Sequence, residues 1–303
     1  MSEIRKVPAS AGAEWLLTGF GLLKRAPLAL GSLGVLWGVG TSLVLSLAML
    51  APAFIGLLLQ FVLILAGPLF MGGLLWAIRE VDQGRQARPS HLLHGVQEGR
   101  APHLLVALLP QLLAALVLGA LLLVLVGTDG LQKLSEVTLK LNEISQSGVQ
   151  PEPAQIEALV ATLPAGRILL WLALMLATFA ALTLALFVMP PQVMFDNATG
   201  VQALRQSLRA SIHNLPAMLV FFVLAFIAIF AIYFAVAIVS LVIALVVGQG
   251  AAMAVMQLLL MAVLMPVFAG SVYAAWKQML APASGNTGSN APPPVNKDHV
   301  FEA

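Results

Sequence analysis

Residues 217–247 read AMLVFFVLAFIAIFAIYFAVAIVSLVIALVV, a continuous apolar run without a charged side chain. A hydrocarbon core about 30 Å thick is crossed by about 20 apolar residues in an α-helix. This stretch is longer than one crossing needs, so we expect a helix that tilts or ends early. The run predicts a helical membrane protein, because a membrane barrel shows short alternating segments instead.

The same pattern recurs on both sides of this stretch. Six runs are long enough to span a bilayer: Leu28–Leu50, Pro52–Ile78, His103–Val126, Ile168–Met189, Ala217–Val247 and Ala251–Trp276. Hydrophobic residues make up 60% of the 303-residue chain and charged residues 9%, against about 45–50% and 25% in soluble domains. These proportions exclude a soluble enzyme, a disordered chain and a nucleic-acid-binding domain. The predicted fold is an all-α integral membrane protein with six transmembrane helices.

The basic residues are distributed unequally between the two sides of the membrane. Only Lys133, Lys140 and Arg167 of the 15 Lys and Arg residues fall on the side that carries residues 127–166. Because cytoplasmic segments carry an excess of Lys and Arg, we expect both termini in the cytoplasm. The first apolar run begins at Leu28 and is too long for a secretory signal peptide.

A threefold repeat is predicted from the segments that precede the odd-numbered spans. Each has an amphipathic helical pattern, over residues 10–24, 89–99 and 199–213, and then a proline that starts a transmembrane hairpin. The alternative explanation is that every membrane helix of this type needs a proline stop and a basic cytoplasmic end, whether or not it belongs to a repeat. Six prolines are expected to have structural roles: Pro27, Pro68, Pro102, Pro190, Pro216 and Pro266.

Two segments differ from the rest of the membrane domain, which we assign to residues 1–281. Residues 127–166 form an external insertion with amphipathic helical spacing. This insertion either lies on the outer membrane surface or binds a partner protein. Residues 282–303 are rich in Ser, Gly, Asn and Pro, and predict a disordered cytoplasmic tail.

Few side chains within the spans can carry out chemistry. The six runs contain no Asp, Glu, Lys or Arg, which argues against a coupled transporter or pump. Gln60, Gln111 and Gln257 are expected either to join helices by hydrogen bonds or to contact a substrate. The glycines between residues 31 and 40 are expected to allow close helix packing.

Basic residues at the cytoplasmic interface are the main candidates for ligand binding. Arg205, Arg209 and His213 follow one another at helical spacing and form one stripe, and Arg25 and Arg100 precede other spans. Such side chains attract anionic lipid headgroups. An ordinary excess of positive charge on the inner side would give the same pattern, so both interpretations remain open.

One further group of polar residues and one single acidic residue are candidates for a site. His91, His94 and Glu98 would share one face of a helix over residues 89–99, either as a metal or pH-sensing site or as a solvated face. Asp196 would either cap the helix that follows it or pair with an arginine. An enzyme would have to use these histidines, Asp196 and His103, and we expect no enzymatic activity.

The remaining motifs give no indication of a bound cofactor. The chain has no cysteine, which removes disulfides, thiolate catalysis and cysteine-based zinc sites. It also shows no nucleotide-binding loop, catalytic triad or paired carboxylates. We therefore expect no cofactor and no metal, with membrane lipids as the main partners.

The N-terminus carries a specific motif. Residues 5–16 read RKVPASAGAEWL and fit the pattern R-x-V-P-A-x-x-G-x-x-W-L. Over residues 4–280 the chain resembles an uncharacterised family of proteobacterial multi-pass inner-membrane proteins with this opening. The resemblance implies a bacterial inner-membrane location and no known activity, so it assigns no catalytic residue.

These observations predict a non-enzymatic inner-membrane protein that organises anionic lipid or partner proteins at its cytoplasmic face. A transporter or a lipid-translocating protein is the alternative, because repeats and prolines late in a span accompany discontinuous helices around substrate sites.

Overall fold

The chain forms thirteen helical segments and no strand within residues 3–147 and 153–280, which the computed structural model describes. Six helices are long and apolar enough to cross a membrane, which confirms the predicted six-span all-α fold. The segments are α1 (Ala11–Arg25), α2 (Pro27–Leu50), α3 (Ala53–Asp82), η1 (Pro89–Leu93), α4 (His94–Gln97), α5 (Ala101–Leu105), α6 (Leu108–Ser147), α7 (Pro153–Ala161), α8 (Ala165–Leu186), α9 (Met189–Phe195), α10 (Gly200–His213), α11 (Leu215–Val247) and α12 (Gln249–Met279). The predicted tail 282–303 lies outside the described residues.

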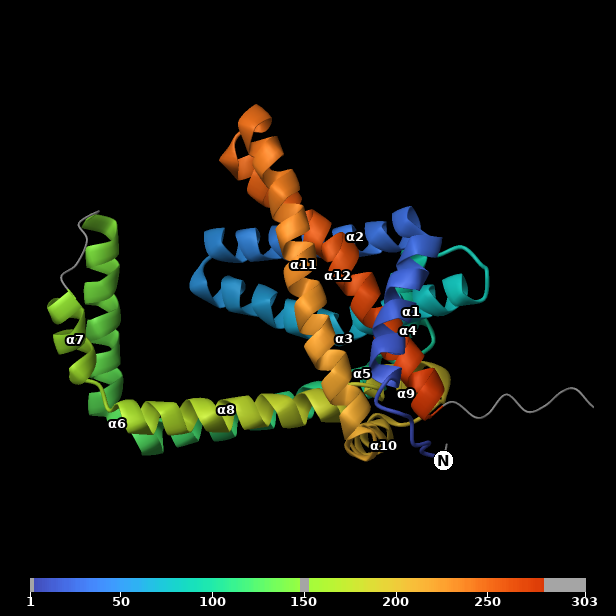
Figure 1. Cartoon of the computed structure of the whole chain (residues 1–303), viewed down its shortest axis with the longest axis horizontal. Coiled ribbons are helices and arrows are strands. Elements are labelled where there is room, and N and C mark those ends of the chain that lie inside the picture. Colours follow the sequence, from blue (N-terminus) through green and yellow to red (C-terminus); the bar gives the residue numbers. More distant parts are fainter. Residues whose placement is uncertain (1–2, 148–152, 281–303) are drawn as a thin grey trace, which may run out of the picture.

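Three helical hairpins extend from one end of the molecule, where the shorter helices pack together (Figure 1). The hairpins are α2–α3, α6–α8 and α11–α12. We call this end the base; it comprises α1, η1, α4, α5, α9 and α10 with the adjoining ends of α3, α11 and α12. Short helices precede each hairpin in turn, so the order of elements follows the predicted threefold pattern.

The predicted turns lie close to where the sequence indicates. Pro27 is the first residue of α2, and Pro102 and Pro216 lie in the first turns of α5 and α11. Pro190 is likewise in the first turn of the short helix α9, so the fourth span already ends at Leu186. Gly248 has a φ of 94° and separates α11 from α12, so the fifth span runs to Val247 without ending early.

Pro68 and Pro266 behave differently from the other four. Both lie inside helices, and α3 and α12 continue beyond them for several turns. Beyond each proline the helix enters the base, where its side chains become buried. These two residues therefore mark the point at which an exposed span continues into the packed base.

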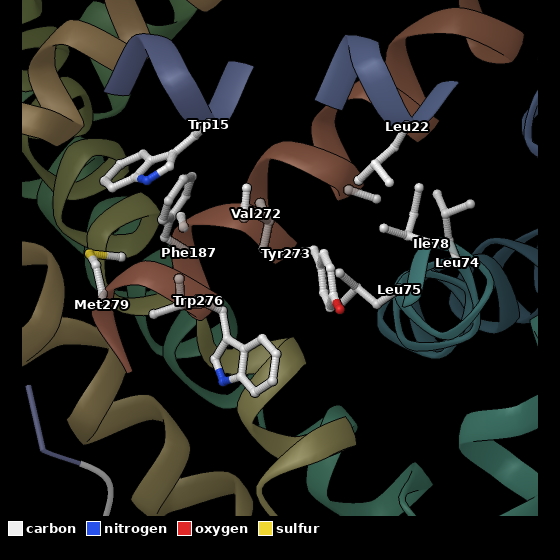
Figure 2. Close-up of a cluster of buried hydrophobic side chains, with 14 of the residues drawn as sticks. Trp15, Leu22, Leu74, Leu75, Ile78, Phe187, Val272, Tyr273, Trp276 and Met279 are labelled. Atoms are coloured by element: carbon white, nitrogen blue, oxygen red, sulfur yellow. The ribbon is translucent and has the colours of Figure 1, made fainter. Parts of the chain in front are cut away.

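The hydrophobic core lies in the base and draws on distant parts of the chain. Figure 2 shows Trp15 of α1 beside Phe187, with Val272, Tyr273 and Trp276 of α12 close by. Trp15 is fully buried, and its indole Nε1 donates a hydrogen bond to Gln278 Oε1 at 2.8 Å. The core thus joins the two ends of the chain.

Helix α1 packs in the seam between α11 and α12. A Cβ atom on Gly12 would lie 2.2 Å from the Ala217 carbonyl oxygen, and one on Gly19 would lie 2.4 Å from that of Val267. The sequence indicated an apolar face with Trp15, Leu16, Phe20 and Leu23. Trp15 is buried as this pattern predicts, and Leu16 and Leu23 pack against the core, but the most buried positions also include Gly12, Gly19 and Leu22. Glycine occupies the two positions at which α1 comes closest to the backbones of α11 and α12.

The glycines of α2 have the predicted packing role. Cβ atoms on Gly34 and Gly38 would lie 2.2 Å and 3.2 Å from atoms of Met261 on α12, whereas Gly40 faces open space. The Gln257 side chain donates a hydrogen bond from α12 to the Ser42 hydroxyl at 3.0 Å, as predicted for a packing glutamine. Gln60 and Gln111 are exposed, and neither forms a hydrogen bond with the described residues.

The α6–α8 hairpin stands apart from the other two along its outer part (Figure 1). The Trp171 indole donates a hydrogen bond to the Leu118 carbonyl at 2.9 Å and joins the two helices. At Gly127, with φ 74° and ψ 168°, α6 bends sharply, and its outer segment then runs beside α7. The insertion therefore contains two helical segments as predicted, and residues 148–152 between them lie outside the described range.

Candidate functional site

Helix α10 presents the predicted basic stripe. Thr199 caps its N-terminus in a capping box with Gln202. The buried face of the helix carries small residues, and the Ser207 hydroxyl accepts a hydrogen bond from the Val188 amide at 3.1 Å. Arg205, Arg209 and His213 lie on the exposed face, so helical spacing placed these three correctly.

Asn214 fastens the N-terminal arm, residues 3–10, to the junction of α10 and α11. Its side-chain oxygen accepts a hydrogen bond from the Val7 amide at 2.8 Å. Its amide group donates to the carbonyls of Arg5 and Ala210, each at 3.0 Å. Asn214 is almost fully buried, and a buried amide with all these partners fixes a single position of the arm.

Arg5 holds the other side of the arm. Its backbone amide donates to the Met279 carbonyl at 2.9 Å, and its guanidinium donates to the Lys277 carbonyl at 3.0 Å. Arginine near a helix C-terminus stabilises the last carbonyl groups, which have no partner within the helix. The arm is therefore stretched between α12 and the α10–α11 junction.

A hollow of about 630 Å³ results where the arm passes α10. We call it the arm–α10 hollow; it is lined by Ile4, Lys6, Arg209, Ile212 and His213. No acidic side chain from the described ranges lines it. Two cations and an imidazole beside two isoleucines suit an anionic group that is attached to an apolar body.

The other predicted lipid-binding residues lie outside this hollow. Arg205 is exposed on α10 but is not part of the lining. Arg25 lies 3.8 Å from Asp82, which also accepts hydrogen bonds from Lys277 at 2.8 Å and Tyr273 at 3.1 Å. Arg100 donates a hydrogen bond to the side chain of Asn197. The five predicted residues thus form no single surface.

Asp196 does not cap α10, because Thr199 does. Asp196 ends α9, and its carboxylate accepts a hydrogen bond from the Trp276 indole at 2.9 Å. Burial raises the pKa of this carboxyl above its ordinary value, and the Trp276 hydrogen bond opposes the shift. Neither predicted role, cap or ion pair with an arginine, is found for Asp196 among the described residues.

His91, His94 and Glu98 lie near one another as predicted, since His94 Nε2 is 3.6 Å from Glu98 Oε1 and the His91 and His94 ring centroids are 6.5 Å apart. Residues 89–93 form a 3₁₀ helix, and α4 ends at Gln97 before Gly99 with φ +68°. The His91 ring accepts a hydrogen bond from the Arg88 amide at 3.2 Å, and burial lowers the pKa of His91. His94 packs on the Trp76 ring at 3.8 Å. Within the described part of the chain no three His, Asp or Glu side chains are grouped to hold a metal.

The N-terminal motif has a structural explanation. Arg5 and Val7 fasten the arm, and Gly12 and Trp15 seat α1 in the core. Ile4 and Lys6 line the hollow although no sequence pattern predicts a site there. They become part of this site only because tertiary hydrogen bonds hold the N-terminal arm beside α10.

Comparison with protein-family models, with curated proteins and with solved structures finds no match. The function must therefore be inferred from the geometry of the chain itself.

Proposed function

We propose that this chain is a non-enzymatic protein of a bacterial inner membrane that binds anionic lipid headgroups at its cytoplasmic face. The observation that carries this proposal is the arm–α10 hollow, which is lined by Lys6 and Arg209 together with apolar Ile4 and Ile212. The bacterial location and the membership of the inner-membrane family rest on the N-terminal motif. Cytoplasmic termini rest on the distribution of Lys and Arg.

Charge and position both support a lipid headgroup as the ligand. The hollow lies beside the first residues of α11, a helix apolar enough to span a membrane. Each basic residue near an anionic membrane surface contributes about 1 kcal/mol of attraction. A phosphate at this position would contact Lys6 and Arg209, and the isoleucines would face the glycerol backbone and upper chains.

The test is a lipid titration followed by native mass spectrometry of the protein in a mild detergent. Lys6→Gln with Arg209→Gln is expected to weaken phosphatidylglycerol binding by about thirtyfold and to leave phosphatidylcholine binding unchanged. Lys24→Gln is the control, because Lys24 is exposed near the membrane but lies outside the hollow.

A third variant separates a site from a general charge effect. Arg205→Gln changes a residue on the same helix that does not line the hollow. If Arg205→Gln and Lys24→Gln weaken binding as much as Arg209→Gln, the hollow is not a site and the proposal fails.

Lipid translocation receives less support than lipid binding. The expectation of discontinuous helices rested on Pro68 and Pro266, and α3 and α12 continue through both prolines.

One observation favours binding of a partner protein at residues 127–166: Leu139 is 60% exposed on the outer segment of α6. The same mass spectra distinguish a bound protein from a bound lipid by mass.

A further inference from the structure

An apolar groove runs along the α11–α12 hairpin where α1 covers it. One wall carries Leu16 and Phe20 of α1, and the other carries Leu264 and Phe268 of α12. The groove has a volume of about 230 Å³. We call it the α1–α11–α12 groove.

The groove exists because α11 carries small residues at its floor. Ala225 and Ala228 lie one turn apart on the side of α11 that faces the groove, and both are half-buried. Above and below them the chain places Phe221 and Ile232. Alanine leaves room that these larger side chains would fill.

The lining of the groove does not call for water or a polar ligand. Ser271 is the only lining residue with a polar side chain, and its hydroxyl already donates to the Val267 carbonyl at 2.8 Å. An ordered water needs two to four polar partners. A dry groove on a membrane-spanning hairpin will therefore hold hydrocarbon.

The position of the groove relates it to the arm–α10 hollow. His213 of the hollow and Phe221 of the groove are joined by the first turns of α11. His213 ends α10 and α11 begins two residues later at Leu215, so Phe221 lies about 9 Å along α11 from its first residue, at about 1.5 Å per residue. A lipid whose headgroup is held at the hollow would have its chains at the depth of the groove.

We propose that the α1–α11–α12 groove binds one acyl chain of an inner-leaflet phospholipid. This inference rests on the lipid-binding function proposed above and names a diacyl lipid as its ligand, in place of a soluble anion. Helix α1 forms a fixed wall beside the acyl chain, because close contacts at Gly12 and Gly19 hold α1 against α11 and α12.

The experiment uses the full chain in nanodiscs that contain phosphatidylglycerol with a photoreactive diazirine in the middle of one acyl chain. After irradiation, labelled residues are mapped by mass spectrometry. We expect labelling of Leu16, Phe20, Ala225 and Ile232 to exceed that of the exposed α8 side chains Leu176 and Phe179. Equal labelling of the groove and α8 would overturn the proposal.

Ala228→Phe fills the groove and provides the decisive variant. Labelling of the groove is expected to fall by about tenfold, because the acyl chain loses the buried contacts of a few of its methylene groups. Ala180→Phe is the matched control, since Ala180 is exposed on α8. Ala228→Val is a smaller change that guards against misfolding and should give an intermediate loss. Groove labelling that is unchanged by both Ala228→Phe and Ala228→Val, or that Ala180→Phe lowers as much as Ala228→Phe, would overturn the proposal.

A second lipid separates this inference from the headgroup proposal. Photoreactive phosphatidylcholine that labels the groove as strongly as phosphatidylglycerol would support the acyl-chain site and contradict the anionic headgroup site. Loss of preferred groove labelling, with phosphatidylglycerol binding still dependent on Lys6 and Arg209, would contradict only the acyl-chain site.

Discussion

The base and the α6–α8 hairpin are held together in different ways. In the base, backbones touch at glycines and buried polar groups have specific partners, as at Gly12 and Asn214. In the hairpin, most side chains face outward, and only 6% of the most apolar window of the third span is buried. The base is therefore held by many specific contacts between distant segments, whereas the hairpin has few buried side chains and is joined at the Trp171–Leu118 hydrogen bond.

The largest expected difference between the two regions comes from their tryptophans. Trp15→Ala should lower the free energy of unfolding by about 4 kcal/mol, because it leaves a cavity in the core and removes the hydrogen bond that Gln278 Oε1 accepts from Trp15. Trp171→Ala in α8 should cost about 1 kcal/mol, since that ring is only half-buried and loses one hydrogen bond. Thermal unfolding of both variants in the same detergent measures the difference. Equal shifts would show that the base has no special packing.

Glycine substitutions test the same difference in packing between the base and the α6–α8 hairpin. Gly12→Ala should destabilise the protein by about 3 kcal/mol, because the new methyl group meets the backbone of Ala217 and Phe221. Gly119→Ala in α6 meets nothing within 4 Å, and alanine favours a helix over glycine by about 1 kcal/mol. The melting temperature should fall for the first variant and stay or rise for the second. A stable Gly12→Ala protein would contradict the seating of α1 between α11 and α12.

The sequence predicted the features that depend on local patterns. Six spans, the turns at Pro27 and Gly248 and the exposed stripe of α10 follow from hydrophobic runs, turn residues and helical spacing. These properties are set by neighbours within a few residues. The helical segment expected over residues 89–99 is found over residues 89–97, as a 3₁₀ helix followed by α4, and Gly99 with its positive φ lies just beyond its end.

Features that depend on distant contacts could not be predicted. Val7 and Asn214 are 207 residues apart, and no local pattern predicts a contact between them. On α1 the hydrophobic pattern indicated Trp15 but not Gly12 and Gly19, because a glycine counts as a gap in such a pattern. The arm–α10 hollow is lined by both Lys6 and Arg209, and only the tertiary fold brings them to one hollow.

Asn214→Ala tests how the base assembles this hollow. Loss of the side chain leaves the Val7 amide and the Arg5 carbonyl without their partner, at a cost of about 2 kcal/mol. The arm should detach from α10, become sensitive to protease and lose phosphatidylglycerol binding, although Lys6 and Arg209 are intact. An arm that stays protected in this variant would show that Arg5 alone fastens it.

Asp196 gives a smaller effect with a defined pH dependence. Its pKa is raised above 3.8 in the folded protein, so its contribution to stability is present below that pH and is lost as pH rises through the folded pKa. Asp196→Asn removes this titration and keeps an acceptor for Trp276. At neutral pH we expect it to be at least as stable as the wild type, whereas Asp196→Ala should lose about 1 kcal/mol. The difference in unfolding free energy between wild type and Asp196→Asn, measured against pH, checks the sign.

Gly127→Ala should have the smallest effect on the base, because the change lies at the far end of the α6–α8 hairpin. The φ of 74° and ψ of 168° at this position belong to a region that essentially only glycine occupies, so alanine is strained there by about 1–3 kcal/mol. The outer segment of α6 can change direction to relieve that strain without disturbing the core around Trp15 or the arm at Asn214. We therefore expect altered protease cleavage within residues 128–147 and an unchanged melting temperature for the base. A fall in that melting temperature would mean that the hairpin and the base unfold as one unit, and that the contrast between them is one of composition rather than of stability.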